Sequence, residues 1–264
     1  YTLLKKAAYY ERHLEEWGQK RLGLVHKLEW DAKLKEFVRE AGDNDGGYSC
    51  DYLAAQAYRY AVTKDPEARR EAVNAFHTIR WFEAMTGIKG FPARAVWAKN
   101  ERGHQAQHGS GEAAAEWHDT KDGLFEWKGD TSSDEICAHF YAVALFLELA
   151  AQGEEVQQAK TFLSRVAGHL MDHGWQLIDL DGKPTRWGRW SPEYFNAAGE
   201  GNAARGLNAL EILSFIKTAE MLTGEPRFAQ GYQELVKLGY PEYTLRQKCT
   251  FPPGDVLQFL EHLA

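Results

Sequence analysis

The chain has 264 residues, of which 44% are hydrophobic and 13% aromatic, so it can bury the core of one large domain and is not a disordered chain. Its formal net charge is −7, which excludes the basic surface that a nucleic-acid-binding protein needs. The longest apolar stretch, around residues 136–147, is shorter than the roughly 18 residues of a membrane span, so we expect a soluble protein without one.

The chain begins with Tyr1 rather than Met, so we expect a processed or trimmed piece of a longer protein. Its three cysteines, Cys50, Cys137 and Cys249, are odd in number and lack the spacing of a metal site. They predict no disulfide framework, and we expect neither a metal nor any other cofactor.

Hydrophobic periodicity predicts a series of helices separated by loops that carry glycines and aromatic residues. The first three helices are expected at residues 3–19, 48–61 and 66–86. A proline is well tolerated in the first turn of the third helix, and Gly87 ends that helix. Residues 88–128 show little periodicity, so we expect a long connection there, of the kind that is usually functional or mobile.

The next helix, at residues 136–151, is apolar on nearly every face, so other helices must enclose it. An amphipathic helix follows at residues 154–173, and the pattern of residues 175–190 predicts a short β-hairpin with a polar turn. A last pair of helices is expected at residues 207–222 and 226–238.

An enclosed helix followed by an amphipathic helix occurs three times, near residues 48–86, 131–173 and 205–238. The turns inside the first and third pairs are alike, since residues 63–66 read Thr-Lys-Asp-Pro and residues 223–226 read Thr-Gly-Glu-Pro. This alternation predicts an all-α fold, an α/α toroid in which an outer ring of helices wraps an inner ring. An irregular helical bundle is the alternative.

In a toroid, the loops that enter the inner helices converge at one end, so the residues before each enclosed helix face a common cavity. Three such loops combine carboxylates with aromatic side chains, at residues 43–48, 127–135 and 186–196. The helix N-termini that follow carry partial positive charge and free N–H groups, which stabilise ionised carboxylates or bind an anionic ligand. The chemistry is therefore expected in these loops.

Acidic side chains before the second inner helix are the first catalytic candidates. Ser132 and Glu135 have the spacing of a capping box, which gives Glu135 a structural role at the start of the helix. Asp130 and Asp134 are not explained by that box. Asp130 is the preferred catalytic acid or base, and Asp134 is the next candidate.

The first loop supplies possible partners for Asp130. Asp43 or Asp45 would face it across a sugar-sized cavity, as the second group of a general acid and base pair. The segment Asp43-Asn44-Asp45-Gly46 also resembles the opening of a calcium loop, but the later ligands of such a loop are missing. A plain turn is therefore the favoured interpretation.

Arginines and tryptophans alternate in the third loop, in the segment Arg186-Trp187-Gly188-Arg189-Trp190. Aromatic rings stack on the apolar faces of sugars, and an arginine fork pairs with a carboxylate, so the segment suits an acidic sugar. The alternative is a hairpin whose tryptophans plug the barrel end and whose arginines neutralise nearby acids such as Asp179 and Asp181. The predicted substrate-binding residues are Asn44, Tyr48, Trp127, Arg186, Trp187, Arg189, Trp190, Glu193 and Tyr194.

The histidines are less specific. His139 lies one turn inside the most apolar helix, where it is either a neutral base or a hydrogen-bonded core residue. His169 and His173 have a spacing that can bind a metal, but they lie in a last helical turn, where histidine complements the helix dipole. Three more histidines share a loop, but no companion ligands accompany them, so no zinc site is predicted there. They are His104, His108 and His118.

Four segments of this chain resemble the helical domain of a poorly characterised bacterial group, in many members of which that domain follows a β-propeller of the two-component-regulator type. The segments are residues 43–46, 86–94, 127–135 and 181–194. More distantly, the chain is similar to the α/α-toroid (six-hairpin) glycosidases and polysaccharide lyases, at the level of fold.

The resemblance covers roughly residues 43–240 and carries several implications. It implies a periplasmic or extracellular location, a role in glycan chemistry, and a β-propeller domain in the parent chain. It also implies that residues 1–264 form a single toroid-like domain whose ring of helices is incomplete, because related chains run further.

We expect a carbohydrate-active enzyme, foremost a glycoside hydrolase that uses paired carboxylates on an oligo- or polysaccharide of acidic or plant type. A polysaccharide lyase is the near alternative, with Arg189 or Asn44 neutralising a uronate and His139 or Tyr194 as the base. The hypothesis of another class is a sugar-binding or sensor module, which would not depend on Asp130.

Overall fold

The computed structural model describes residues 2–40, 42–101, 103–104, 116–197 and 200–245. Helices make up most of this part of the chain, as the sequence predicts. They are α1 (Leu3–Glu16), α2 (Asp45–Thr63), α3 (Pro66–Thr86), α5 (Ser133–Leu149), α6 (Glu154–Asp172), α7 (Pro192–Asn196), α8 (Glu200–Thr223), α9 (Pro226–Lys237) and α10 (Tyr240–Thr244). The strands are β1 (Lys20–Arg21), β2 (Leu24–Val25), β3 (Leu28–Asp31), β4 (Glu36–Glu40), β5 (Ala95–Ala98), β6 (Gly103–His104), β7 (Trp117–Asp119), β8 (Phe125–Lys128), β9 (Gln176–Ile178) and β10 (Pro184–Arg189).

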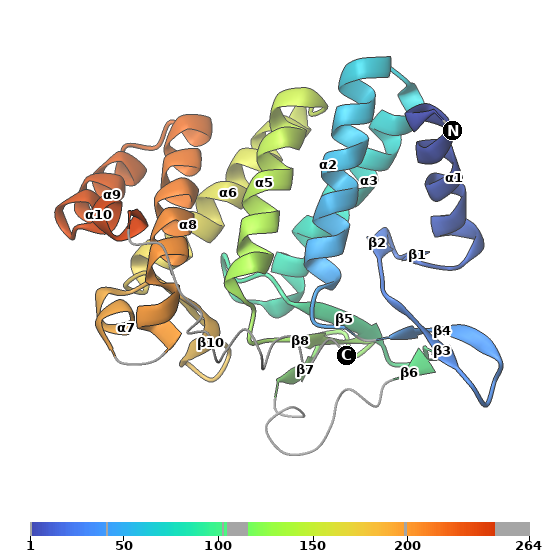
Figure 1. The fold of residues 1–264 in the computed structure, drawn as a ribbon, viewed down its shortest axis with the longest axis horizontal. Helices are drawn as coiled ribbons and strands as arrows, with labels where there is room; N and C mark the ends of the chain where they lie inside the picture. The colour runs from blue at the N-terminus through green and yellow to red at the C-terminus, as the bar shows by residue number, and fades with distance from the viewer. Residues whose placement is uncertain (1, 41, 102, 105–115, 198–199, 246–264) are drawn as a thin grey trace, which may run out of the picture.

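Three helical hairpins stand side by side (Figure 1). The helices α2, α5 and α8 form a row, with α3 and α6 behind it and α9 at its end. We call α2, α5 and α8 the inner helices. Their N-terminal ends all point toward the end of the molecule where most of the strands lie. The three predicted helix pairs correspond to α2–α3, α5–α6 and α8–α9.

The ends of α3 illustrate how local sequence sets these hairpins. Lys64 ends α2 in the left-handed conformation, and the Asp65 side chain then accepts a 2.9 Å hydrogen bond from the Glu67 N–H in the first turn of α3. At the other end, Gly87 has a φ of 70°, which glycine adopts without strain. Both ends of α3 lie where the sequence predicts them.

Stacked phenylalanines join the three hairpins into one core. Phe76 of α3 stacks on Phe146 of α5 with ring centroids 4.4 Å apart, and Phe140 of α5 stacks on Phe215 of α8 at 4.8 Å. All four side chains are buried. The helix α5 therefore packs on both neighbouring hairpins, which explains why its sequence is apolar on nearly every face.

The prediction of a long connection without regular structure over residues 88–128 is wrong for the residues of this segment that the structure describes. It contains the three-stranded antiparallel sheet β5-β8-β7. Every residue of β5 is buried, so its sequence lacks the alternation of polar and apolar residues that signals a half-buried strand. The rings of Trp97 and Trp127 lie within this sheet and are almost completely buried.

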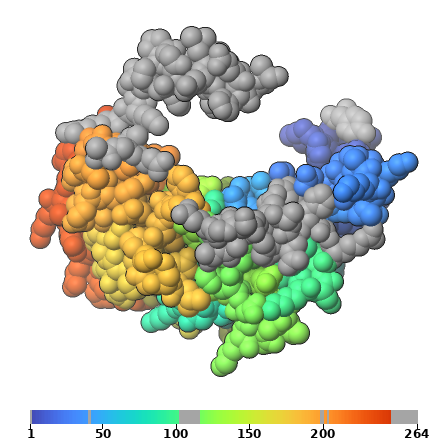
Figure 2. Space-filling model, turned by 90° about the horizontal axis from the view of Figure 1, so that it is seen from below, coloured from blue at the N-terminus to red at the C-terminus, as the bar shows by residue number. Residues whose placement is uncertain are grey.

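Other strands flank the helices. The predicted hairpin near residues 175–190 is confirmed as the antiparallel pair β9 and β10. Two further sheets, β1-β2 and β3-β4-β6, precede or accompany α2 and were not predicted. Figure 2 views the molecule from the strand end, with the β3–β4 region in blue and the residues near β10 and α7 in orange at opposite sides.

Exposed side chains at intervals of three, four or seven residues mark one face of each inner helix. They are Tyr48, Asp51, Tyr58 and Val62 on α2, Asp134, Tyr141 and Glu148 on α5, and Leu207, Leu210, Ser214 and Met221 on α8. We call this set the inner-helix face.

Within the described part of the chain, each helix is too short or not apolar enough to cross a membrane.

Candidate active site

The structure pairs the preferred catalytic acid with a predicted substrate-binding arginine. Asp130 accepts hydrogen bonds from the Arg186 backbone N–H at 2.7 Å and from Arg186 Nε at 2.8 Å. Arg186 also contacts Glu116, and the Asp130 N–H donates to Asp179 at 2.6 Å. Arg186 therefore neutralises nearby acids, as in the alternative interpretation of the third loop. The acids are Asp130 and Glu116 rather than the expected Asp179 and Asp181.

Since both Asp130 oxygens are engaged, Asp130→Asn is expected to lower the free energy of unfolding by about 1.5–3 kcal/mol, the value of hydrogen bonds to a charged group. Urea denaturation measures this loss. The control Asp181→Asn removes an exposed carboxylate 3.6 Å from the exposed Lys183 and should leave stability nearly unchanged. Equal stability of the two variants would contradict the structural role of Asp130.

Asp45 is completely buried and does not face a cavity, contrary to its predicted catalytic role. Its carboxylate lies 3.2 Å from His26 Nδ1 and 3.3 Å from Arg39 Nη2. Arg39 in turn contacts Glu101 and lies over the ring of Trp97. Burial lowers the pKa of His26 despite the carboxylate beside it. Asp45 thus holds the start of α2 to the strands.

Asp43 lies at the surface, with its side chain half exposed and paired with Lys128. Partial burial raises its pKa, but the hydrogen bond from Lys128 and the charge of Arg94 outweigh this and hold the pKa below its usual range. Asn44 occupies the N-cap of α2 without a capping hydrogen bond from its side chain. Asp43 is therefore an ion-paired carboxylate, and no metal-binding group of acids, histidines or cysteines occurs among the described residues.

The predicted capping box at Ser132 and Glu135 is wrong. The Ser132 hydroxyl contacts Asp134 instead of the helix backbone, and Glu135 Oε1 accepts a 3.1 Å hydrogen bond from the Gly47 N–H of α2. A Cβ at Gly46 would collide with the second Glu135 oxygen, so the two helices approach closely there. Glu135 is 1% exposed, and burial raises its pKa well above the ordinary value.

His139 is a core residue in this structure. Its side chain is fully buried and stacks on Phe162, and Nδ1 lies 2.6 Å from the Glu135 carbonyl oxygen. Because that oxygen can only accept, Nδ1 carries a proton, and the imidazole is neutral because burial disfavours its charged form. Burial lowers the pKa of His139 to about 4. His139 is therefore not placed to act as a base on a ligand.

Asp134 is the predicted catalytic carboxylate that remains accessible to a ligand. It is exposed in the first turn of α5, and within the described chain it forms no ion pair. Two buried carboxyl groups flank it, Glu135 toward α2 and Glu211 on α8, and the charge of Asp134 contributes to the raised pKa of each. We call Asp134, Glu135 and Glu211 the carboxyl cluster.

Glu211 was not predicted from the sequence. Its side chain reaches α5 from α8, where it accepts a 2.9 Å hydrogen bond from Trp190 Nε1 and bonds with Ser133 and Cys137. Burial is the main cause of its raised pKa, which these bonds partly offset. The sequence does carry one signal that could have identified it, because Glu211 is a single acid in an otherwise apolar stretch of an inner helix.

The predicted aromatic platforms divide into buried and exposed rings. Trp127 and Trp190 are fully buried and so cannot stack on a sugar, which corrects their predicted role. Trp187 and Tyr48 are about two-fifths exposed. The remaining residues of the third loop are Arg189, which lies 4.7 Å from the centre of the Tyr194 ring, and the exposed Glu193.

The candidates that remain are thus the carboxyl cluster and, among the predicted aromatic platforms, the exposed rings of Tyr48 and Trp187. His108 and Cys249 lie outside the described residues, as does the side chain of His104. No protein-family model, curated protein or solved structure gives a significant match to this chain.

Proposed function

We propose that this chain is a carbohydrate-active enzyme of the glycoside hydrolase class, in which Asp134 and Glu211 are the acid and base pair. The observation that carries the proposal is the approach of Glu211 on α8 to the first turn of α5, next to the exposed Asp134. Two carboxyl groups in different environments, one buried and one open, are what glycoside hydrolysis requires.

The proposed roles follow from burial. Glu211 has a raised pKa and retains its proton more readily, so it protonates the glycosidic oxygen as the bond to the anomeric carbon breaks. Asp134 is exposed and takes a proton from the water that attacks that carbon. Tyr48 and Trp187 offer rings to the sugar. Elimination with His139 as base is disfavoured because that side chain is buried.

The fold supports the same proposal more broadly. Three inner helices with outer partners are the arrangement expected of part of an α/α toroid, and the carboxyl cluster joins the first turn of α5 to the middle of α8. The resemblance to a bacterial helical domain adds a periplasmic or extracellular setting and a β-propeller in the parent chain to this proposal. The acidic or plant-type glycan remains the proposed substrate class.

The test measures release of reducing ends from neutral and uronate-containing oligosaccharides. With the substrate that wild type cleaves, Asp134→Asn and Glu211→Gln are each expected to lower kcat by about 10²- to 10⁴-fold, the range of general acid–base catalysis. The control Glu148→Gln removes another exposed acid of α5 and should leave kcat unchanged.

Undiminished turnover by Asp134→Asn would remove that residue from the mechanism. An unsaturated product with ultraviolet absorbance would assign elimination instead of hydrolysis. Binding of an oligosaccharide by wild type, with no turnover of any substrate in the panel, would favour the sugar-binding module.

A further inference from the structure

The hairpin formed by β3 and β4 extends beyond the helices at one edge of the molecule (Figure 1). Cross-strand pairing places Trp30 opposite Phe37, and the two rings meet edge to face with their centroids 5.2 Å apart. Trp30 is 53% exposed, Phe37 61% and Leu34 in the turn 47%. We call these three residues the hairpin patch. The outer half of the hairpin therefore presents three large apolar side chains to the solvent.

The acids of the hairpin lie on the opposite face from its aromatic rings. Successive side chains of a strand point to opposite sides, so the paired residues Trp30 and Phe37 share one face. The acids of the two strands share the other face, and they are Glu29, Asp31 and Glu36. An apolar surface that meets the aromatic face therefore leaves these carboxylates in water.

Two lysines flank the apolar side chain of the turn. Lys33 and Lys35 precede and follow Leu34, and both are exposed. Asp31 Oδ1 accepts hydrogen bonds from the N–H groups of Lys33 at 2.7 Å and of Leu34 at 2.9 Å, which orders the backbone of the turn. Among the residues that the structure describes, neither lysine side chain has an acidic partner. Their charges are therefore available to an external anion.

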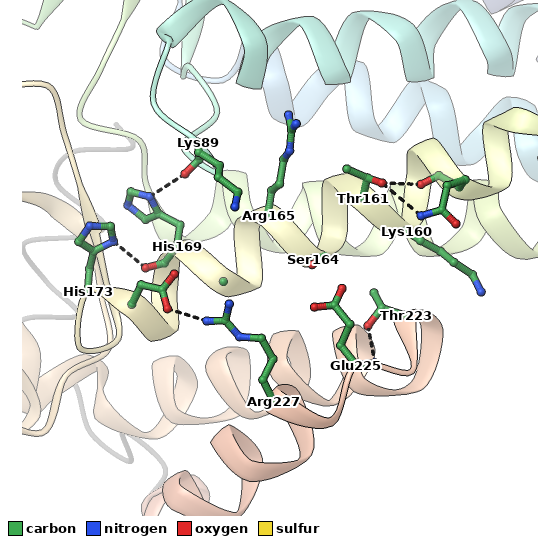
Figure 3. Close-up of a pocket in the computed structure, with 13 residues that line it drawn as sticks. Lys89, Lys160, Thr161, Ser164, Arg165, His169, His173, Thr223, Glu225 and Arg227 are labelled. Atoms are coloured by element: carbon green, nitrogen blue, oxygen red, sulfur yellow. Dashed lines mark hydrogen bonds and ion pairs between the residues drawn. The ribbon is translucent and has the colours of Figure 1, made fainter.

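Cationic side chains in the groove between α6 and α9 are arranged differently. Arg227 is paired there with Asp172 at 2.6 Å, and Lys160 and Arg165 point away from each other (Figure 3). The hairpin tip differs from this groove because it combines two lysines without acidic partners with exposed apolar side chains.

A flat surface that is apolar inside and anionic outside fits this tip. A projecting hairpin reaches a bilayer ahead of the helices, aromatic rings favour the membrane–water interface, and each nearby lysine is attracted to anionic headgroups. The planes of the two rings cross at 69°, so they do not form one flat platform for a sugar chain. Salt screens charges beyond about 8–10 Å, which limits the repulsion from the net charge of −7.

We propose that the β3–β4 hairpin docks on a lipid surface that contains anionic headgroups. The hairpin patch enters the interfacial layer, and Lys33 and Lys35 contact the headgroup charges. The base of the hairpin stays in the protein, since β4 pairs with β6 and Val38 is buried. The contact is peripheral, and it does not rest on the proposed glycan chemistry because it uses no residue of the carboxyl cluster.

Cosedimentation of the full chain with phosphatidylcholine vesicles, with and without about a quarter of phosphatidylserine, tests this proposal. Wild type is expected to bind the anionic vesicles, and less so at high salt. Leu34→Ser is expected to weaken binding about three- to tenfold, because the exposed half of the leucine side chain is no longer transferred from water. Lys33→Gln/Lys35→Gln is expected to weaken binding about fivefold for each lysine removed.

Two matched controls lie elsewhere on the chain. Leu180→Ser removes a leucine that is 55% exposed in the turn between β9 and β10. Lys89→Gln/Lys160→Gln removes two lysines of the groove between α6 and α9. Both control variants should bind anionic vesicles as wild type does.

Several results would overturn the proposal. They are the absence of wild-type binding to anionic vesicles, equal weakening by the controls, and equal binding by all variants. Hairpin variants that change only self-association would assign the patch to a second copy of the chain, and variants that change only the affinity for an oligosaccharide would assign it to a glycan. Circular dichroism of each variant distinguishes a folding defect from a loss of affinity.

Discussion

When the pH falls from 7 to 5, the unfolding free energy of the wild-type protein is expected to fall by about 2 kcal/mol more than that of the His139→Gln variant. The folded-state pKa of His139 is lowered to about 4, whereas an unfolded histidine titrates near 6.5. Between these values the unfolded chain binds the proton and the folded protein does not, so acid favours unfolding. Glutamine has no such titration. Urea denaturation at both pH values measures the difference.

The neighbouring acid gives a control of opposite sign. Burial raises the pKa of Glu135, so the folded protein keeps a proton that the unfolded chain releases as the pH rises. Relative to Glu135→Gln, wild type is therefore expected to become more stable as the pH falls from 7 to 5. The burial of His139 and Glu135 would be contradicted if the difference in unfolding free energy between each variant and wild type did not change with pH.

Asp45→Asn is expected to destabilise the fold by about 3–5 kcal/mol, the cost of removing one partner of a buried ion pair. Asparagine keeps the shape of the side chain but leaves the Arg39 guanidinium with less compensating charge. His26 also loses the carboxylate at 3.2 Å. The effect should appear in the urea midpoint without a change in the slope of the transition.

Asp43→Asn is the matched control, because Asp43 lies two residues before Asp45, just ahead of α2, and its carboxylate is half exposed in the pair with Lys128. Its expected cost is about 1 kcal/mol or less. A small loss for both variants would show that Asp45 does not anchor α2 to the strands. A large loss for both would assign the effect to the loop as a whole.

The helices could be predicted because their apolar periodicity extends over many residues. Pro66 and Gly87 mark both ends of α3, and the structure begins and ends the helix there. The strands of residues 95–128 could not be predicted, because each has two to four residues and β5 is buried throughout. Short segments of this kind carry too little periodicity to distinguish them from a loop.

The candidate site could be predicted only in part. The sequence places Asp130 and Asp134 near the start of an inner helix, but the pairing of Asp130 with Arg186 joins residues 56 positions apart. Glu135 likewise meets Gly47 from 88 positions away. Local spacing cannot distinguish a carboxylate neutralised by a distant group from an open one. The exposure of Asp134 and the approach of Glu211 follow from helix packing alone.

The row of helical hairpins also determines how stability is distributed. Each hairpin packs chiefly on its immediate neighbours, and among the described helices α5–α6 joins the other two. Folding is then coupled through nearest-neighbour interfaces, as in a linear array of repeats. Damage to the phenylalanine stacks of α5 would uncouple the hairpins on either side, whereas damage at one end of the row would leave the other interface intact.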